Sequence, residues 1–410
     1  MTSEPHLLVV GASLAGLRAV ESARRSGFAG KITLVGDEVH APYDRPPLSK
    51  QFLTSEEPPS ATVLREEAML RDELGVTLRL GTVATGLDID GRAVVTENGT
   101  IGYTALVIAT GASPRVLPGT GHLSGVHVLR TVDDARSIRA ALDAGARTVV
   151  VGAGFIGSEI AASARARGVD VTVVEAMPTP LARPVGEQMG KVLASLHERH
   201  GTALRVGVGV EGLEGADRVT GVRLADGTTV EAELVVVGIG VSPNTSWLAD
   251  SGLTLDNGVE CDETLWTGVD GVYAAGDLAS WHNPMFDSRM RLEHWTIAAE
   301  QGGHAGRNAA EPAAATAFET VPYFWSDWYG SRIQFVGVAA DADEIATVFG
   351  DLEGDSFVTL YRRGDRLIGA LALEQKSQIM KYRALLAKGA SWDEAIAFAK
   401  ERSAKAAAKA

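Results

Sequence analysis

The sequence predicts an α/β protein with two Rossmann-like nucleotide-binding domains and a smaller C-terminal α+β domain. A strand, glycine turn, helix and second strand occur near the N-terminus, the same order recurs from Arg147, and the composition changes after residue 320. A strand, a crossover helix and a second strand form one unit of a parallel sheet. Two copies in one chain of 410 residues therefore predict two separate nucleotide-binding folds.

The first copy reads HLLVVGASLAGLRAVESARRSGFAGKITLVGDE. Its apolar stretch Leu7 to Val10 predicts a buried strand, and its turn places Gly11, Ser13 and Gly16 at the positions of a G-x-G-x-x-G pattern. Serine replaces the middle glycine, so this copy taken alone is the weaker match. Its hydroxyl could donate to a phosphate, although a Cβ restricts approach to the backbone. The acid expected after the second strand is Asp37 or Glu38.

The second copy runs from Arg147 to Glu175 and matches the full pattern. Gly152, Gly154 and Gly157 lie between a predicted strand and a predicted helix, and Glu175 ends the next strand. The first glycine permits the turn, the second lets the backbone approach a pyrophosphate, and the third allows close packing of helix and strand. The free N–H groups at the helix start attract the phosphate. This copy predicts a dinucleotide site, and the alternative is a Rossmann helix without a nucleotide.

Two further strands and one acid are expected to complete these units. Leu106 to Gly111 and Leu234 to Gly240 are apolar strands stopped by glycine, and a proline follows each of them. The stretch Thr267 to Asp277 reads TGVDGVYAAGD, a short apolar strand followed by Gly276 and Asp277. An aspartate opposite the first glycine turn could accept hydrogen bonds from the hydroxyl groups of a sugar-alcohol chain. The alternative role for Asp277 is a helix N-cap.

The region after residue 320 predicts a third, α+β domain. Residues 321–330 read VPYFWSDWYG and concentrate five aromatic residues in a chain that is only 6% aromatic. Strand-like segments follow at 333–338, 356–361 and 366–373, and a helical end rich in Ala and Lys begins near Ser377.

Composition excludes several classes of function. A net charge of −14 argues against nucleic acid as the main partner, because phosphate binding needs a basic footprint. The longest apolar runs are far shorter than a membrane span, and the N-terminus does not look like a signal peptide, so we expect a cytoplasmic protein without a membrane partner. The single cysteine, Cys261, excludes an intramolecular disulfide, and the nine histidines show no metal-binding spacing, so we expect no metal.

Taken together, these segments resemble the pyridine-nucleotide-linked flavin reductases, in which an inserted NAD domain interrupts an FAD domain. The resemblance implies a first FAD-binding part at 1–112, an NAD-binding domain at 113–244, a second FAD-binding part at 245–320 and a C-terminal reductase domain at 321–410. The closer resemblance is to the ferredoxin reductases of bacterial oxygenase systems, of the putidaredoxin reductase type, and it covers nearly the whole chain. The motifs that carry it are YDRPPLSK, GFIGSE, the Gly-Asp segment, EHWTIAAEQG and FWSDWYG. Ser13 departs from the glycine consensus of these proteins.

The resemblance implies a cofactor site and a catalytic pair. Lys50 resembles the lysine beside the flavin, and Glu159 resembles its acidic counterpart on the NAD side. Read without the resemblance, Lys50 and Arg130 would be solvated charges, and Trp295 and Trp328 would be core aromatics. The residues expected to bind FAD or NADH are Gly11, Ser13, Leu14, Ala15, Gly16, Asp37, Arg45, Lys50, Val83, Ala109, Thr110, Gly111, Arg130, Gly152, Gly154, Phe155, Ile156, Gly157, Glu159, Glu175, Arg183, Gly240, Gly276, Asp277 and Trp295.

The implied function is an NADH-dependent flavoprotein reductase. It would take a hydride onto FAD and pass single electrons to a two-iron ferredoxin that serves a cytochrome P-450 class oxygenase or a ring-hydroxylating dioxygenase. Alternatives are a rubredoxin reductase and a non-enzymatic, NAD-sensing flavoprotein. An NADH oxidase, peroxide reductase or disulfide reductase of this superfamily would need a redox cysteine within Ala41 to Lys50, and that segment contains none.

Two finer expectations concern the partners. Glu175 and the absence of a following cation favour NADH over NADPH, with Arg183 the nearby cation that could weaken the preference. The carrier should dock near the flavin edge between the NAD and C-terminal domains, close to Trp328, and the protein should be a monomer or weak dimer. We expect a basic stretch near the C-terminus to suit an acidic ferredoxin. The alternative is that these charges form an ordinary solvated face. The stretch comprises Arg362, Arg363, Arg366, Lys376, Lys381 and Arg383.

Overall fold

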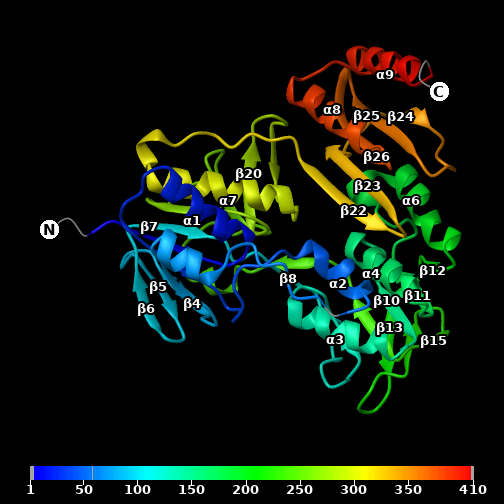
Figure 1. Ribbon diagram of the computed structural model, residues 1–410, viewed down its shortest axis with the longest axis horizontal. Coiled ribbons are helices and arrows are strands. Elements are labelled where there is room, and N and C mark those ends of the chain that lie inside the picture. Colours follow the sequence, from blue (N-terminus) through cyan, green and yellow to red (C-terminus); the bar gives the residue numbers. More distant parts are fainter. Residues whose placement is uncertain (1–3, 58, 408–410) are drawn as a thin grey trace. The chain divides into compact units, whose positions relative to one another are not determined.

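The computed structural model describes residues 4–57 and 59–407, without the side chains of 403–407, and it divides into two compact units (Figure 1). Unit 1 comprises the chain up to Asp44, Ala61–Ser113 and Val241–Thr320. Unit 2 comprises Arg45–Ser60, Pro114–Gly240 and the chain from Val321 onward. The first unit is thus interrupted in sequence by the second, as expected for an FAD domain with an insertion.

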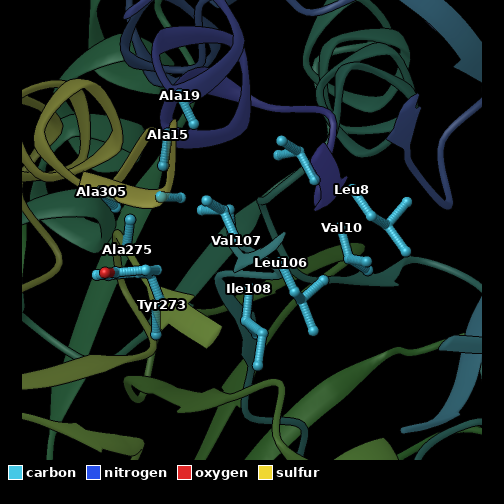
Figure 2. Close-up of a cluster of buried hydrophobic side chains, with 14 of the residues drawn as sticks. Leu8, Val10, Ala15, Ala19, Leu106, Val107, Ile108, Tyr273, Ala275 and Ala305 are labelled. Carbon is cyan, nitrogen blue, oxygen red and sulfur yellow. The ribbon is translucent and has the colours of Figure 1, made fainter. Parts of the chain in front are cut away.

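A parallel sheet of five strands forms the centre of unit 1. Its strand order is β19-β7-β1-β2-β3, and every neighbouring pair is parallel. Each residue from Leu7 to Val10 is at most 2% exposed, because helices cover both faces of such a sheet. Figure 2 shows part of this core, where side chains of β1, β7 and β19 meet those of two helices. The strands are β1 (His6–Val10), β2 (Lys31–Val35), β3 (Val76–Arg79), β7 (Ala105–Ile108) and β19 (Val272–Ala274).

Two helices of unit 1, α1 (Leu14–Arg25) and α7 (Trp295–Ala310), pack side by side at unusually short range (Figure 1). A Cβ at Gly302 would lie 2.2 Å from the carbonyl oxygen of Ala15, and a Cβ at Gly306 would lie 2.2 Å from that of Ala19. Only glycine permits this approach. The contact fixes α7 against the helix that follows the first glycine turn.

Smaller sheets complete unit 1. They are the antiparallel sheet β4-β5-β6, the sheet β18-β20-β21 and the pair β8-β17. Their strands are β4 (Ala84–Asp88), β5 (Ala93–Thr96), β6 (Gly99–Gly102), β8 (Ala112–Pro114), β17 (Val241–Pro243), β18 (Val259–Cys261), β20 (Ala279–Asn283) and β21 (Ser288–Met290). Short helical turns are η2 (Met69–Glu73), η3 (Ser246–Leu248) and η4 (Pro312–Ala314).

Unit 2 contains the second parallel sheet, with the order β12-β11-β10-β16-β9. A three-stranded antiparallel sheet, β13-β14-β15, accompanies it. The strands are β9 (Val126–His127), β10 (Thr148–Val151), β11 (Val171–Glu175), β12 (Ala203–Val206), β13 (Val210–Glu214), β14 (Gly221–Leu224), β15 (Thr229–Glu231) and β16 (Leu234–Val237). The helices are η1 (Pro46–Ser49), α2 (Gln51–Thr54), α3 (Val132–Asp143), α4 (Phe155–Ala166), α5 (Ala182–Val185) and α6 (Glu187–Arg199).

The C-terminal part of unit 2 is an antiparallel sheet of order β22-β23-β26-β25-β24 with two helices. The three strand-like segments of the sequence correspond to β23, β25 and β26. The sequence missed two strands, because the aromatic segment carries polar residues and the other is half exposed on both faces. The elements are β22 (Tyr323–Trp328), β23 (Ser331–Gly337), β24 (Glu344–Gly350), β25 (Phe357–Arg363), β26 (Arg366–Leu373), α8 (Lys376–Ala387) and α9 (Trp392–Ala407).

The two parallel sheets and the C-terminal antiparallel sheet confirm the predicted fold class. The four-part domain division stays a prediction, since the structure groups 114–240 and 321–410 into one unit. No helix among the described residues is both long and apolar enough to span a membrane. Within the same described ranges, no group of three or more His, Cys, Asp or Glu side chains is placed to hold a metal ion.

Candidate functional site

The first glycine turn joins β1 to α1 in unit 1. Gly11 has φ of +117°, and a Cβ there would lie 2.0 Å from the carbonyl oxygen of Ala109. A Cβ at Gly16 would lie 1.8 Å from the carbonyl oxygen of Gly11. Both glycines are therefore required by the protein's own backbone. Ser13 is the N-cap residue of α1, and its side chain makes no capping hydrogen bond to the helix.

The second glycine turn joins β10 to α4 in unit 2 and repeats this geometry. Gly152 has φ of +102°, and a Cβ there would lie 2.3 Å from the carbonyl oxygen of Gly238. A Cβ at Gly157 would lie 2.2 Å from the carbonyl oxygen of Gly152. The middle residue, Gly154, differs, because the nearest atom to a Cβ there would be 4.0 Å away. Open space at the middle glycine is what a pyrophosphate against the backbone needs.

The starts of α1 and α4 are suited to bind phosphate. Neither helix has a side-chain cap or an acid in its first turn, so the first N–H groups keep their donor capacity. The helix dipole adds partial positive charge at the same point. Both turns therefore fit the pyrophosphate of a dinucleotide, one in each unit.

Glu175 ends β11 beside the second turn. Its carboxylate accepts the N–H of Ala153 at 2.8 Å and the N–H of Met177 at 2.9 Å. These bonds hold the acid at the turn while leaving lone pairs for ribose hydroxyls. The acid of the first unit is less constrained, because Asp37 is exposed and accepts the N–H of its neighbour Glu38 at 3.0 Å. Glu38 instead accepts the hydroxyl of Tyr43 at 2.5 Å.

Exposed apolar side chains surround the second turn. Ile156 is 48% exposed, Met177 60% and Ile239 39%, and they follow the carboxyl ends of β10, β11 and β16 respectively. Ligands of open α/β sheets bind at that edge, and clustered exposed apolar groups mark a binding site. The sequence predicted Ile156 but missed Met177 and Ile239, because a single exposed apolar residue after a strand gives no signal by itself.

Asp277 follows β19 in unit 1, and β19 is the neighbour of β7 in the sheet. The preceding residue, Gly276, has φ of +83° and donates its N–H to Oε1 of Gln301 at 2.9 Å. Arg291 donates to the carbonyl oxygen of Asp277 at 2.8 Å. Backbone bonds thus fix the turn that carries the Asp277 carboxylate. Gln301 is fully buried and was missed by sequence reasoning, although its motif was noted.

The other cofactor residues predicted in unit 1 lie in loops or at the start of a helix. Ala109 to Gly111 follow β7 and are tied to Asn244, whose side chain donates to the carbonyl oxygen of Thr110 at 2.9 Å. Val83 is 43% exposed. Trp295 begins α7 and donates its indole N–H to Asp44 at 2.6 Å. Leu14 and Ala15, in the first turn of α1, are buried.

The predicted catalytic pair, Lys50 and Glu159, is brought together in unit 2. The Lys50 ammonium lies 2.8 Å from Oε2 of Glu159, and their side chains are 17% and 6% exposed. Ser49 donates to the same oxygen at 2.5 Å, and Ser326 donates to Oε1 at 2.5 Å. A buried carboxylate needs such partners to remain charged. The sequence predicted the pair but not the two serines.

Five more of the predicted residues lie in unit 2. Arg45 donates to the carbonyl oxygen of Arg130 at 2.5 Å, so these two cations are neighbours. Arg183 lies on α5 and is exposed. Gly240 is exposed with φ of +97°, and its carbonyl oxygen accepts the N–H of Arg115. Phe155 begins α4 and packs on Phe324, with 4.7 Å between ring centroids.

A buried histidine supports α4 from behind. His197 is fully buried on α6, and burial lowers its pKa to about 4. Its Nε2 lies 3.1 Å from the hydroxyl of Ser158 and its Nδ1 lies 2.7 Å from that of Tyr329. Tyr329 donates to Thr202 at 2.9 Å, and burial raises its pKa to about 12. Both groups are therefore neutral at pH 7, and we assign them a structural role.

Trp328 is buried, as its reading without the resemblance predicted, and docking of the carrier close to it stays a prediction. It is 1% exposed and packs on His197, with 5.4 Å between ring centroids. A side chain at that depth makes no direct contact with a carrier protein. Alternation along β22 places Tyr323 and Trp325 on the opposite face, where both are partly exposed and stack at 5.9 Å.

The comparisons with known proteins agree with this geometry. Residues 5–302 match the family model described as pyridine nucleotide-disulphide oxidoreductase, and residues 323–408 match the model described as reductase C-terminal. The first match covers well over half of the chain. This chain belongs to the pyridine nucleotide-disulphide oxidoreductase family. It is an oxidoreductase, and FAD and NAD(H), which this family uses, fit its two glycine turns.

Individual relatives narrow the comparison. The chain is 39% identical to rhodocoxin reductase of Rhodococcus erythropolis over 93% of this chain and 89% of that protein. It is 38% identical to the ferredoxin–NAD(+) reductase component of the p-cumate 2,3-dioxygenase system of Pseudomonas putida, over 86% of this chain and 85% of that protein. The structure of a covalent putidaredoxin reductase–putidaredoxin complex matches with a TM-score of 0.89 and 31% identity, over 94% of this chain and 93% of that one.

Proposed function

We propose that this oxidoreductase is an NADH-dependent reductase that passes electrons singly from bound FAD to a two-iron ferredoxin of an oxygenase system. The observation that carries the proposal is the pair of glycine turns, one in each unit, whose backbone is suited to bind a pyrophosphate. The relatives of the chain are named as reductases, one of them as a component of a dioxygenase system. When bound, FAD accepts a hydride from NADH and releases its two electrons one at a time.

The chain's own residues bind and orient the two nucleotides. The N–H groups at the start of α1 hold the FAD pyrophosphate, and Asp277 accepts hydrogen bonds from the sugar-alcohol hydroxyls. The start of α4 holds the NADH pyrophosphate, while Glu175 accepts the ribose hydroxyls of adenosine. Lys50 and Glu159 form an ion pair in unit 2, and the Lys50 ammonium, held by Glu159, would supply positive charge to the reacting ring. Catalysis is then mainly positioning, because hydride transfer between the two rings needs no side-chain acid or base.

Thiol chemistry is a poor alternative. Several related enzymes reduce disulfides through a cysteine beside the flavin, but the one cysteine of this chain is Cys261. Cys261 is 3% exposed, and burial raises its pKa to about 12. The thiolate that such a reaction requires is therefore not formed near neutral pH.

The carrier site that we propose lies on the face of β22 that carries Tyr323 and Trp325, beside α8. Arg383 of α8 stacks over the Tyr323 ring at 5.8 Å, which combines aromatic surface with positive charge. Of the basic stretch, Arg362 is ion-paired with Glu344 at 3.2 Å. The exposed members that remain for an acidic partner are Arg363, Arg366, Lys376 and Lys381.

The function is tested with purified holoprotein and NADH. Reduction of cytochrome c should depend on an added two-iron ferredoxin, and denaturation should release FAD rather than FMN. Turnover with rubredoxin but not with ferredoxin would favour the rubredoxin reductase alternative. Reduction of FAD without turnover on any iron–sulfur acceptor would favour the NAD-sensing alternative.

The carrier site is tested by salt and by charge reversal. Added salt should slow carrier reduction while leaving NADH reduction of FAD nearly unchanged, because exposed charges are screened over about 10 Å at 0.1 M salt. Lys381→Glu should slow only the carrier step, and Lys31→Glu, which reverses an exposed charge in unit 1, is the matched control. Equal salt sensitivity of the two steps would contradict this docking face.

A further inference from the structure

The carboxylate of Glu159 is held from two sides by different segments of unit 2. Oε2 accepts from Ser49 at 2.5 Å and lies 2.8 Å from the Lys50 ammonium. Oε1 accepts from the Ser326 hydroxyl at 2.5 Å and, more weakly, from the N–H of Asp327 at 3.4 Å. One oxygen therefore contacts the segment that carries Lys50, and the other contacts β22 of the C-terminal sheet.

Ser326 is itself oriented by a second group. The indole N–H of Trp328 donates to the Ser326 hydroxyl oxygen at 2.8 Å. Because that bond occupies the oxygen as an acceptor, the hydroxyl proton is directed to Glu159. Ser326 is fully buried and Trp328 is 1% exposed, so water does not compete for either bond. Charge-assisted bonds of this length in a dry site are among the stronger ones in proteins.

Trp328 is in turn fixed by packing. Its ring lies 6.1 Å from that of Phe155 at the start of α4 and 5.4 Å from that of His197. A continuous chain of contacts therefore runs from the C-terminal sheet to the lysine, through Trp328, Ser326, Glu159 and Lys50.

The position of the Lys50 ammonium depends on this chain of contacts. Within the part of the chain that the structure describes, its ammonium otherwise makes two longer contacts, to the carbonyl oxygen of Pro46 at 3.2 Å and to the Ser49 hydroxyl at 3.5 Å. Lys50 also lines an open pocket of about 460 Å³, together with Gln51 and Ser163. If Glu159 turned away from Lys50, the ammonium could move into that hydrated space, because a lysine side chain is long and flexible.

We propose that Ser326, oriented by the Trp328 indole, is a positioning residue for the reduction of FAD by NADH. It holds the Glu159 carboxylate in the rotamer that keeps the Lys50 ammonium in place. The proposal rests on the proposed function, since it assigns to Lys50 and Glu159 a role beside the flavin. It adds that a strand of the C-terminal sheet, whose other face is the proposed carrier site, sets the geometry of this pair.

Ser326→Ala tests the proposal in the holoprotein by stopped-flow reduction with NADH. The limiting rate of reduction should fall about tenfold, the size expected for one lost bond to a charged group, while the dissociation constant of NADH changes less than twofold. Spectroelectrochemistry should show a more negative midpoint potential for bound FAD, because a displaced ammonium stabilises the reduced form less. A change in packing alone would not produce this combination.

Ser158→Ala is the matched control. It removes a hydroxyl of the same kind, also fully buried, from the residue next to Glu159, where the hydroxyl contacts His197 instead. It should leave both the limiting rate and the potential unchanged. Trp328→Phe keeps an aromatic ring but removes the indole N–H, and it should shift both quantities in the direction of Ser326→Ala by a smaller amount.

The outcomes separate this inference from the function on which it rests. If Ser326→Ala and Trp328→Phe match Ser158→Ala in rate and potential while Lys50→Met slows reduction, the positioning role is wrong and the function stands. If Lys50→Met itself leaves the rate and the potential unchanged, the role assigned to the pair is wrong. A higher dissociation constant for NADH at an unchanged limiting rate would also overturn the positioning role.

Discussion

The two glycine turns share a backbone but differ at their middle residue. The first and third glycines of each turn face carbonyl oxygens that a Cβ would approach to between 1.8 and 2.3 Å. The middle residue is Ser13 in the first turn, whereas Gly154 in the second faces open space. The first and third positions are therefore dictated by the fold, and the middle one by the ligand.

The acidic residues beside the two turns also differ, in how firmly the backbone holds them. Glu175 accepts two backbone N–H groups at the second turn, one of them within it, whereas Asp37 is exposed and accepts the N–H of its neighbour Glu38. The first unit instead adds Asp277, on a turn fixed by Gln301 and Arg291. One unit is suited to a nucleotide that binds and leaves, and the other to one that is held by additional groups along its length.

Gly152→Ala should cause the largest loss. The substitution puts a Cβ at φ of +102° and 2.3 Å from the carbonyl oxygen of Gly238. Left-handed strain and overpacking together should lower the free energy of unfolding by about 4 kcal/mol. Urea denaturation measures the loss, and Gly145→Ala, which also has positive φ but no atom within 4 Å, should cost far less. Equal losses would show that contact with Gly238 is unimportant.

Glu175→Ala should change the choice of nucleotide. An NADPH phosphate about 4 Å from the carboxylate would be repelled by roughly 4 kcal/mol at an effective dielectric constant near 20, before screening. We therefore expect kcat/KM to favour NADH by about a hundredfold in the wild type and much less in Glu175→Ala. Adding Ala176→Arg should narrow the gap further. An unchanged ratio in Glu175→Ala would remove the carboxylate from the specificity site.

Asp277→Ala should weaken the binding of FAD in unit 1 and leave the binding of NADH in unit 2 unchanged. A hydrogen bond from a buried hydroxyl to a charged group contributes about 1.5 to 3 kcal/mol. The dissociation constant of FAD, measured by reconstitution of stripped protein, should rise by at least tenfold, while the affinity for NADH stays within a factor of two. Unchanged FAD retention would exclude Asp277 from the cofactor site.

The pH dependence of stability should reflect the histidine behind the second turn. Burial lowers the folded-state pKa of His197 to about 4, below its ordinary value of 6.5. Between these two values the unfolded chain binds more protons, so His197 lowers stability as pH falls below about 6.5. At pH 5.5 the loss should be about 1.4 kcal/mol. In His197→Asn this part of the pH dependence should disappear from urea denaturation curves, and an identical slope would contradict the assignment.

The smallest effect should come from exchanging the middle residues. Gly154→Ser should weaken NADH binding about tenfold without changing the free energy of unfolding, because its Cβ enters only the space meant for the ligand. Ser13→Gly should leave FAD retention nearly unchanged. A large loss of stability in Gly154→Ser would show that the fold, not the ligand, selects glycine there.

The sequence predicted what depends on local pattern. Both glycine turns, their strands and the Lys50 and Glu159 pair could be inferred because each has a short motif. Contacts between segments distant in the sequence could not be inferred. Ser326 lies 167 positions from Glu159, and Gln301 bonds a glycine 25 positions away, so neither role has a local signature. Trp328 could be expected in the core as a large aromatic residue, but its bond to Ser326 joins two residues whose shared inward face of β22 the motif alone does not fix.

An anaerobic titration tests the central claim most directly. Purified protein is titrated with NADH while the visible absorption of FAD is followed, and the reduced protein is then titrated with oxidised two-iron ferredoxin. The proposed function predicts complete bleaching by one equivalent of NADH per FAD and complete recovery by two equivalents of ferredoxin. Recovery by one equivalent of a two-electron acceptor but by no amount of ferredoxin would contradict it.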